Sequence, residues 1–223
     1  MVKAMKFHTD YVFTDRETKA KYVWEKYHSI LMGRHILDVG ADECHLKQYL
    51  DDEASYWGVG LGGNPDQQVD LEKGPLPFDN GSFDSVLCLD VLEHLESIHR
   101  TFDELCRVTR KFVIVSLPNA FGSFHKACQS GNSYPRLMKF YGLPLEPPSD
   151  RHRWFFSYDE AEEFIEYRAQ KNGMSILQID PPPGRSKYQE LRLRLRWRKY
   201  DWDIVRNFYH PMLWAVLEKD KGS

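Results

Sequence analysis

Short apolar runs alternate with amphipathic stretches along most of the chain, and each has the length of one element of secondary structure. Between residues 15 and 120 the apolar runs predict strands at 36–39, 56–60, 85–92 and 112–117, and the amphipathic stretches predict helices at 15–32, 42–51 and 97–110. Strands that alternate with helices are typical of an α/β protein whose parallel sheet is covered on both faces. The pattern therefore predicts a doubly wound sheet.

The stretch at 15–32 places its apolar residues at helical spacing, and Thr14 or Asp15 is suited to cap its first turn. A helix at this place either packs against the sheet or covers the mouth of a ligand site. Packing is the favoured interpretation, and the sequence leaves both open.

Beyond residue 120 the pattern is less regular. A helix is predicted over 157–173, with Ser157 or Asp159 at its start and Gly173 past its end. Strands are predicted over the apolar runs at 174–180 and 211–219.

Two segments of this half interrupt the alternation of strands and helices. Residues 121–156 are rich in Gly, Pro and aromatic residues, and they predict an insertion over the carboxyl edge of the sheet that shapes a ligand pocket. Residues 181–210 contain LRLRLRW, which alternates as a strand would but also fits a helical face. We expect one domain over residues 1–223, with a ligand-binding core at 15–120 and insertions at 121–156 and 181–210.

Composition narrows the class of partner. A chain of 223 residues with 42% hydrophobic content can bury one sizeable core. Its net charge of −3 and its pI near 6.3 do not indicate the basic face that nucleic-acid binding requires. The exception is a basic run, which either meets an anionic acceptor or forms a solvated face, the second being favoured; it contains Arg192, Arg194, Arg196, Arg198 and, nearby, Arg206.

Cysteine usage and hydropathy indicate the compartment. The four cysteines lack CxxC spacing, so free thiols in a reducing compartment are expected. No apolar run approaches the length of a membrane span, and the first ten residues lack the apolar core of a signal peptide. The sequence therefore predicts a cytoplasmic protein.

The run ILDVGADECHL, residues 36–46, joins a predicted strand to a turn and a helix. Gly40 allows a sharp turn, and Asp38 stands at the carboxyl end of the strand, where open parallel sheets bind ligands. The run resembles the first motif of class I S-adenosylmethionine-dependent methyltransferases of types 11 and 23, commonly written (I/V)LDxGCGxG. It departs from that motif at Asp42 and Cys44, where the family has glycine.

The resemblance extends to VDLEKGPLPFDNGSFDSVLCLDVLEHL, residues 69–95, and it implies that a third strand ends at 69–71. It implies a Rossmann-like sheet of seven strands, the last of them antiparallel, with an insertion after the fifth strand. It also implies S-adenosyl-L-methionine as the cofactor.

The same resemblance assigns cofactor contacts to particular positions. Asp70 is placed near the adenine amino group, with Leu71 offering backbone. Leu61 occupies the place of the acid that binds both ribose hydroxyls, which leaves that role to Asp66 or to no charged group. The cofactor-binding set is completed by Asp38, Gly40, Ala41 and Asp90.

A second constellation follows the fourth predicted strand. Helical geometry beginning at Asp90 would align Asp90 with Glu93 and His94 on one face, and DRHRW later supplies His152. Two carboxylates and two imidazoles suit a divalent ion such as Mg²⁺ or Mn²⁺, which would lower the pKa of an acceptor hydroxyl. The arrangement is similar to the ExxEH and distant His of metal-dependent O-methyltransferases of ubiquinone biosynthesis and of small-RNA 3′ ends. The alternative has His94, with Glu93 beside it, as a general base without metal.

The resemblance implies methyl transfer from S-adenosylmethionine. The runs DVLEHL, SLPN and DRHRWFFSYDEAEEF resemble bacterial methyltransferases of surface polysaccharide pathways, which favours O-methylation of a sugar or a sugar-linked small metabolite. The alternatives are a phenolic or other natural-product acceptor, and a catalytically idle methyltransferase fold kept as a binding module. A small-molecule acceptor is expected rather than nucleic acid, and the sequence sets no oligomeric state.

Overall fold

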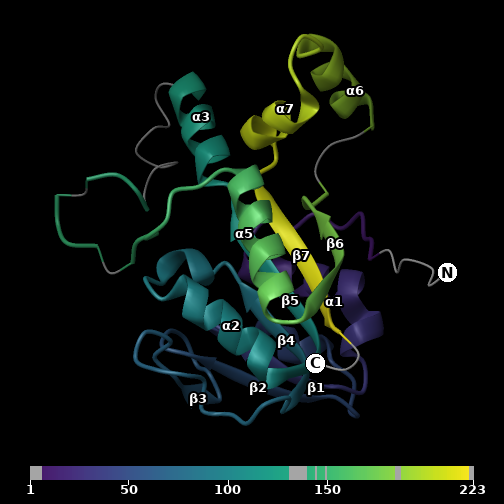
Figure 1. Ribbon diagram of the computed structural model, residues 1–223, viewed down its shortest axis with the longest axis vertical. Helices are drawn as coiled ribbons and strands as arrows, with labels where there is room; N and C mark the ends of the chain where they lie inside the picture. The colour runs from purple at the N-terminus through teal and green to yellow at the C-terminus, as the bar shows by residue number, and fades with distance from the viewer. Residues whose placement is uncertain (1–6, 131–139, 144, 149, 184–186, 221–223) are drawn as a thin grey trace.

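A computed structural model describes residues 7–130, 140–143, 145–148, 150–183 and 187–220 (Figure 1). Parts of both predicted insertions lie outside these described residues. Within them, no helix is both long enough and apolar enough to cross a bilayer.

A seven-stranded sheet with the order β3-β2-β1-β4-β5-β7-β6 forms the centre of the molecule. β7 pairs antiparallel with both β5 and β6, and the other pairs are parallel. The predicted Rossmann-like seven-stranded fold, with an antiparallel last strand, is therefore confirmed. The strands are β1 (His35–Val39), β2 (Ser55–Gly60), β3 (Gln67–Gln68), β4 (Phe83–Leu89), β5 (Thr109–Pro118), β6 (Met174–Asp180) and β7 (Met212–Lys219).

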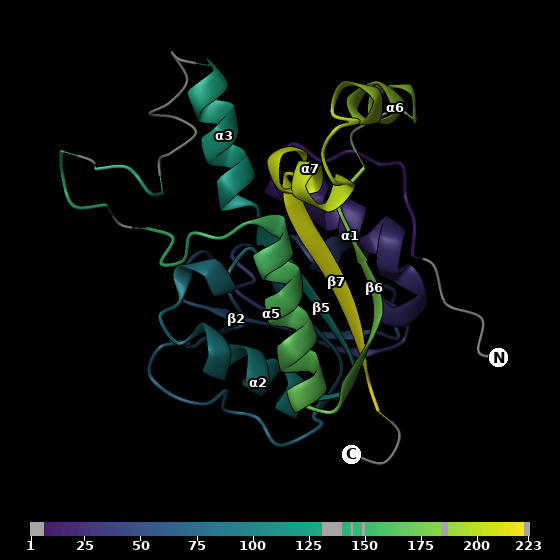
Figure 2. The same cartoon turned by 45° about the horizontal axis from the view of Figure 1, so that its top comes forward.

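Helices cover both faces of the sheet, as Figure 2 shows. One face carries α1, and the other carries α2 and α5, while α3, α6 and α7 lie together beyond the end of the sheet to which β5 and β6 run (Figures 1 and 2). The helices are α1 (Arg16–Leu31), α2 (Ile98–Val108), α3 (Ala120–Ser130), α5 (Tyr158–Lys171), α6 (Lys187–Arg196) and α7 (Trp202–Tyr209), with short 3₁₀ helices η1 (His45–Tyr49) and η2 (Leu92–His94).

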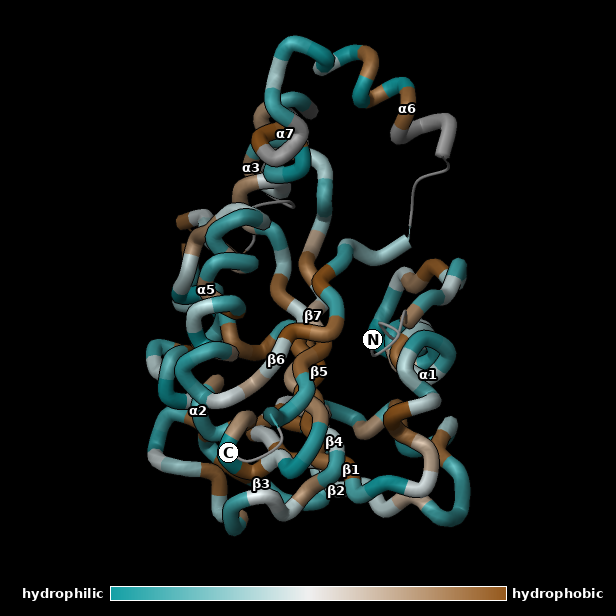
Figure 3. The backbone as a smooth tube through the Cα atoms, turned by 45° about the vertical axis from the view of Figure 1, so that its right-hand side comes forward, coloured by the Kyte–Doolittle hydropathy of each residue, from teal (hydrophilic) through white to brown (hydrophobic). Residues whose placement is uncertain are grey.

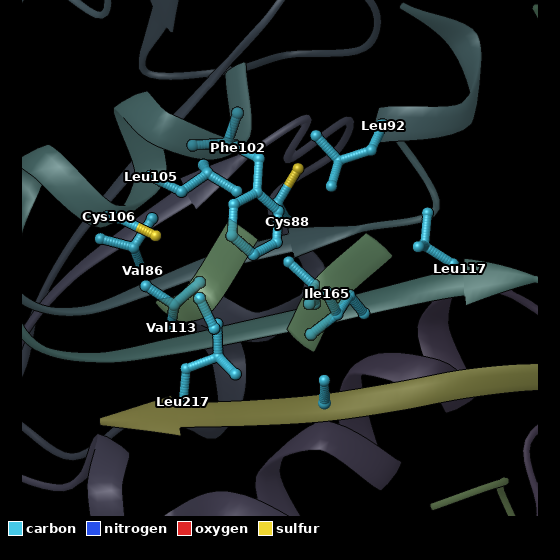
Figure 4. Close-up of a cluster of buried hydrophobic side chains, with 14 of the residues drawn as sticks. Val86, Cys88, Leu92, Phe102, Leu105, Cys106, Val113, Leu117, Ile165 and Leu217 are labelled. Carbon is cyan, nitrogen blue, oxygen red and sulfur yellow. The ribbon is translucent and has the colours of Figure 1, made fainter. Parts of the chain in front are cut away.

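The core has one layer on each face of the sheet. Under α2 and α5, Phe102, Leu105 and Ile165 pack on Val86 and Val113, all of them fully buried (Figure 4). The middle strands are apolar along their length, as the hydropathy colouring shows (Figure 3). Because both faces are covered, these strands have the near-continuous apolar sequences from which they were predicted.

The layer under α1 is aromatic and contains a buried lysine that pairs with a partly buried acid. The rings of Tyr22 and Tyr27 lie 4.9 and 6.1 Å from the ring of Trp214 on β7. Among them the buried Lys26 donates to both carboxylate oxygens of Asp180 at 2.8 Å. The carboxyl-terminal half of α1 is thus fixed to the sheet, which agrees with the favoured packing interpretation.

The caps of two helices agree with the sequence. The Asp15 side chain accepts from the Thr18 N–H, and Thr18 reciprocates in a capping box. Ser157 and Glu160 form the same box at the start of α5, and Gly173 follows its end with φ +62°.

Three expected elements differ from the structure. Residues 42–51 form no α-helix, only the 3₁₀ helix His45–Tyr49, because the backbone at Asp42 and Cys44 is left-handed. β4 ends at Leu89 rather than 92, since Asp90 is also left-handed. β3 occupies Gln67–Gln68, just before the predicted 69–71. In the ambiguous segment the helical interpretation is correct, because LRLRLR lies in α6.

Candidate active site

A cavity of about 780 Å³ lies at the carboxyl ends of β1, β2 and β4. Its walls come from the first turns of α1, from the segments that follow these strands, and from Phe140, Asp150 and His152. This is the place where open α/β sheets bind ligands. Each residue to which the sequence assigned a cofactor or metal role, with the exception of Asp66, lines this cavity; they are Asp38, Gly40, Ala41, Leu61, Asp70, Leu71, Asp90, Glu93, His94 and His152.

Gly40 is required by its surroundings. Its φ is +83°, and a Cβ built there would lie 2.2 Å from Cγ2 of Val91. Its N–H donates to the Val59 carbonyl at 2.7 Å, which holds the turn against β2. A side chain at this position would be both strained and overpacked.

The two departures from the glycine pattern keep the shape of a glycine turn. Asp42 and Cys44 have φ of +52° and +54°, the left-handed region that glycine favours. Asp42 forms an ion pair with Arg16 in the first turn of α1, at the cavity wall. Asp42 and Cys44 therefore differ from the motif in residue type but keep the backbone conformation of its glycines.

Asp38 is a buried acid in the cavity wall. It accepts a hydrogen bond of 2.8 Å from the Tyr56 hydroxyl. Burial raises the pKa of Asp38 to about 6, although the Tyr56 hydrogen bond and the nearby Lys19 charge oppose the shift. Its carboxylate is thus costly to ionise unless a cation binds beside it.

The structure shows which acidic residues lie near Leu61, at the expected ribose position. Leu61 lines the cavity and is 63% exposed. Asp66 does not line the cavity in the described residues, because its carboxylate accepts from the Gly58 N–H at 2.8 Å and pairs with Lys47 at 2.7 Å. The suggestion that Asp66 replaces the missing acid is therefore wrong, and Asp42 is the acid that lines the cavity beside Gly62.

Asp70 and Leu71 follow β3 and line the cavity. The Asp70 carboxylate accepts from the Glu72 N–H at 3.0 Å and lies 3.2 Å from Lys73. These contacts, the Glu72 N–H first, lower the pKa of Asp70, so it is a ready acceptor for an amino group.

Asp90 belongs to a different network from Glu93 and His94. The Ser116 hydroxyl donates to Asp90 at 2.6 Å, and the Lys19 ammonium lies 2.6 Å from its other oxygen. Asp90 has φ +56° and precedes the η2 helix, so the expected helical alignment of Asp90 with Glu93 and His94 is wrong. The metal-ligating set predicted from the sequence therefore loses one carboxylate.

Glu93, His94 and His152 come together. Oε1 of Glu93 lies 3.8 Å from Nε2 of His94 and 4.0 Å from Nε2 of His152, and one ligand atom from each lies within 4.8 Å of the others. The Arg153 N–H donates to the Glu93 carbonyl at 2.8 Å, which folds the DRHRW segment back over η2. Burial, followed by the Asp90 charge, raises the pKa of Glu93 well above its ordinary value.

Two further residues orient the imidazoles, and sequence analysis missed both. Nδ1 of His94 lies 2.6 Å from the Asp150 carboxylate. Nδ1 of His152 lies 2.8 Å from the hydroxyl of Tyr141, which itself donates to the Trp154 carbonyl. Since the single hydrogen of the Tyr141 hydroxyl is given to the Trp154 carbonyl, the proton of His152 belongs on Nδ1. The Nε2 lone pair of His152 is then available on the side of Glu93.

Comparison with known proteins supports the class that the fold defines, an α/β protein with a Rossmann-like sheet. Residues 48–115 match the family model described as "Methyltransferase domain". No curated protein sequence matches the chain.

Solved structures extend the similarity over nearly the whole chain. A SAM-dependent methyltransferase from Archaeoglobus fulgidus is 13% identical with a TM-score of 0.60, covering 92% of this chain and 95% of that one. Magnesium protoporphyrin IX methyltransferase from Synechocystis with bound SAH is 17% identical, TM-score 0.54, covering 92% and 83%. The cyclase SpnF is 16% identical, TM-score 0.53, covering 92% and 82%. The resemblance to class I S-adenosylmethionine-dependent methyltransferases is thus confirmed, and the chain has their fold.

Proposed function

We propose that the protein is an S-adenosylmethionine-dependent methyltransferase that methylates an oxygen of a small molecule. The observation that supports this most is the continuity of one cavity, which has the Gly40 turn and Asp38 at one end and the Glu93, His94 and His152 cluster at the other. A donor held at the first end would face an acceptor at the second.

The cavity fits the cofactor in size and in charge. Its volume of about 780 Å³ is in the range of cofactor sites. The buried carboxylate of Asp38 would face a cation, Asp70 would accept from the adenine amino group, and Leu71 would offer backbone. We infer that Asp42, rather than a residue at Leu61, accepts from the ribose hydroxyls, since a carboxylate can accept two such bonds.

The cofactor, when bound, supplies a methyl group on a sulfonium centre. The remaining work is done by residues that position the acceptor and take its proton. Nε2 of His94 is suited to accept that proton, because the Asp150 carboxylate at Nδ1 stabilises the resulting imidazolium. Burial among Phe140 and Leu95 would keep water away from the reacting oxygen.

The same cluster also fits a divalent metal. Glu93 and the Nε2 atoms of His94 and His152 form a set of one carboxylate and two imidazoles, with Asp150 and Tyr141 fixing the rings as outer partners do in metal sites. Oε2 of Glu93 is buried and has no hydrogen-bond partner among the described residues. A bound Mg²⁺ or Mn²⁺ would lower the pKa of an acceptor hydroxyl. Asp90, held by Lys19 and Ser116, is left out of this set.

The acceptor class rests on sequence similarity. Sugars and sugar-linked metabolites are proposed first, because DVLEHL, SLPN and DRHRWFFSYDEAEEF resemble methyltransferases of surface polysaccharide pathways. A phenolic acceptor is favoured by the Phe140 ring at the cavity wall. Nucleotide sugars and phenols, offered with cofactor carrying a labelled methyl group, separate the two classes by which product takes the label.

The experiment that tests the whole proposal is calorimetric titration with S-adenosylhomocysteine. Binding is expected, and Asp38→Ala and Gly40→Val should each remove it. Absence of heat at millimolar ligand would overturn the proposal. Binding without methyl transfer to any acceptor would instead favour the idle binding module. The cyclase SpnF has a similar fold and is not named a methyltransferase.

A further inference from the structure

Residues 191–200, LRLRLRWRKY, form a surface that the active site does not use; we call them the basic arm. They hold five of the chain's 30 basic residues and none of its 33 acidic residues. None of them lines the active-site cavity. The positive charge of the basic arm therefore serves no contact inside the cavity.

The basic arm projects from the molecule. Figures 1 and 2 show α6 at the opposite end from α2, and Figure 3 shows it standing away from the sheet. Its arginines at 192, 194, 196 and 198 are exposed.

Two leucines are exposed among these arginines. Leu191 and Leu195, one helical turn apart on one face of α6, are 54% and 61% exposed. By helical geometry Arg192 and Arg196 flank this pair on one side and Arg194 on the other. Trp197, near the opposite side, lies 6.1 Å from the ring of Tyr209 on α7 and so faces the protein.

A partner for this surface must accept cations and apolar side chains together. A dissolved polyanion such as RNA pairs with arginine but leaves exposed leucines in water. A bilayer with anionic headgroups satisfies both, because leucines enter the headgroup boundary and guanidinium groups bind lipid phosphates.

We propose that the basic arm binds the surface of a membrane that contains anionic phospholipids. The contact is peripheral, with α6 lying in the plane of the interface. It does not rest on the proposed methyl transfer, because vesicle binding is measured without cofactor or acceptor.

The test is co-sedimentation of the full chain with vesicles of phosphatidylglycerol and phosphatidylcholine, compared with pure phosphatidylcholine. Binding to the anionic vesicles alone is expected, and it should weaken as salt rises. Arg196→Gln with Arg198→Gln should lower the partition coefficient about 30-fold. Leu191→Ser with Leu195→Ser should lower it at least about tenfold.

Matched controls separate the arm from general charge and hydrophobicity. Lys21→Gln with Lys171→Gln removes two positive charges from elsewhere on the protein, and Val12→Ser with Met32→Ser removes two exposed apolar side chains. Both pairs should bind as wild type does. Circular dichroism checks that every variant is folded. Absence of binding to anionic vesicles, or equal effects in arm and control variants, overturns the proposal. The proposal is also overturned if only the arginine variant lowers binding and an RNA oligonucleotide displaces the protein from the vesicles. That result would assign the arm to nucleic acid.

Discussion

Nε2 of His152 lies 4.0 Å from Oε1 of Glu93, although one residue follows β4 and the other precedes α5. The approach is fixed by backbone as well as side chains, because the Arg153 N–H donates to the Glu93 carbonyl at 2.8 Å. A segment outside the core of the sheet thereby completes the polar end of the cavity.

Chelation is expected to stop methyl transfer. If Glu93, His94 and His152 hold a divalent metal, excess EDTA and His152→Ala should each lower the rate at least about 100-fold. Affinity for S-adenosylhomocysteine, measured by calorimetry, should change little, because the cluster lies at the acceptor end. His28→Ala, on the surface of α1, serves as the control. Activity that survives EDTA but not His94→Ala would make His94 a general base and the metal proposal wrong.

Tyr141→Phe should weaken metal binding while leaving every ligand in place. The variant removes the hydroxyl that fixes the proton of His152 on Nδ1. Loss of such an outer partner lowers metal affinity about 10–100-fold. Titration with Mn²⁺ followed by electron paramagnetic resonance measures this affinity. Tyr167→Phe, an exposed tyrosine on α5, should bind Mn²⁺ as the wild type does.

Asp38→Asn should change how stability depends on pH. The folded pKa of Asp38 is about 6, above its ordinary value of 3.8, so the stability that its protonated form contributes is full below pH 4 and is lost as the pH rises through 6. Asparagine undergoes no such loss. The unfolding free energy of the variant relative to wild type should therefore rise by about 2 kcal/mol between pH 4 and pH 7.

Urea unfolding of the cofactor-free protein at a series of pH values measures this difference. Asp52→Asn, an exposed acid outside the cavity, is the control. A difference between Asp38→Asn and wild type that stays constant over this range would contradict the raised pKa.

Gly40→Ala should destabilise the protein by about 2–5 kcal/mol, from a left-handed backbone together with overpacking against Val91. Adding Val91→Ala removes the two closest methyl groups and should recover the overpacking part only. Gly74→Ala is the matched control, because a Cβ there meets nothing within 4 Å. Unfolding free energies of the three variants test the argument, and equal effects at Gly40 and Gly74 would refute it.

The order of strands and helices could be predicted because both faces of the sheet are covered, which gives each strand a continuous apolar run. The contacts of Asp66 and Asp90 could not be predicted. Asp66 pairs with Lys47 and Asp90 with Lys19, and each lysine lies in a distant segment of the chain. The left-handed backbone at Asp42 and Cys44 could not be predicted from these residues either, because glycine is the residue type that routinely adopts this conformation.

The partners of the imidazoles were hidden for a different reason. Tyr141 and Asp150 lie in a segment without periodicity, so nothing in their spacing predicted that they would face His152 and His94. The signal that could have found Asp150 is its place two residues before His152, in the run already selected for its histidine.

The two halves of α1 are held in different ways. Tyr22, Tyr27 and Lys26 fix the second half in the aromatic layer, whereas the first turns meet the cavity through the ion pairs of Arg16 with Asp42 and of Lys19 with Asp90. Fraying of those first turns would break polar contacts without exposing the core. Hydrogen exchange should accordingly be faster at residues 16–19 than at 22–31. The rate at which ligands exchange and the stability of the fold are then separate properties, and either can change in evolution without the other.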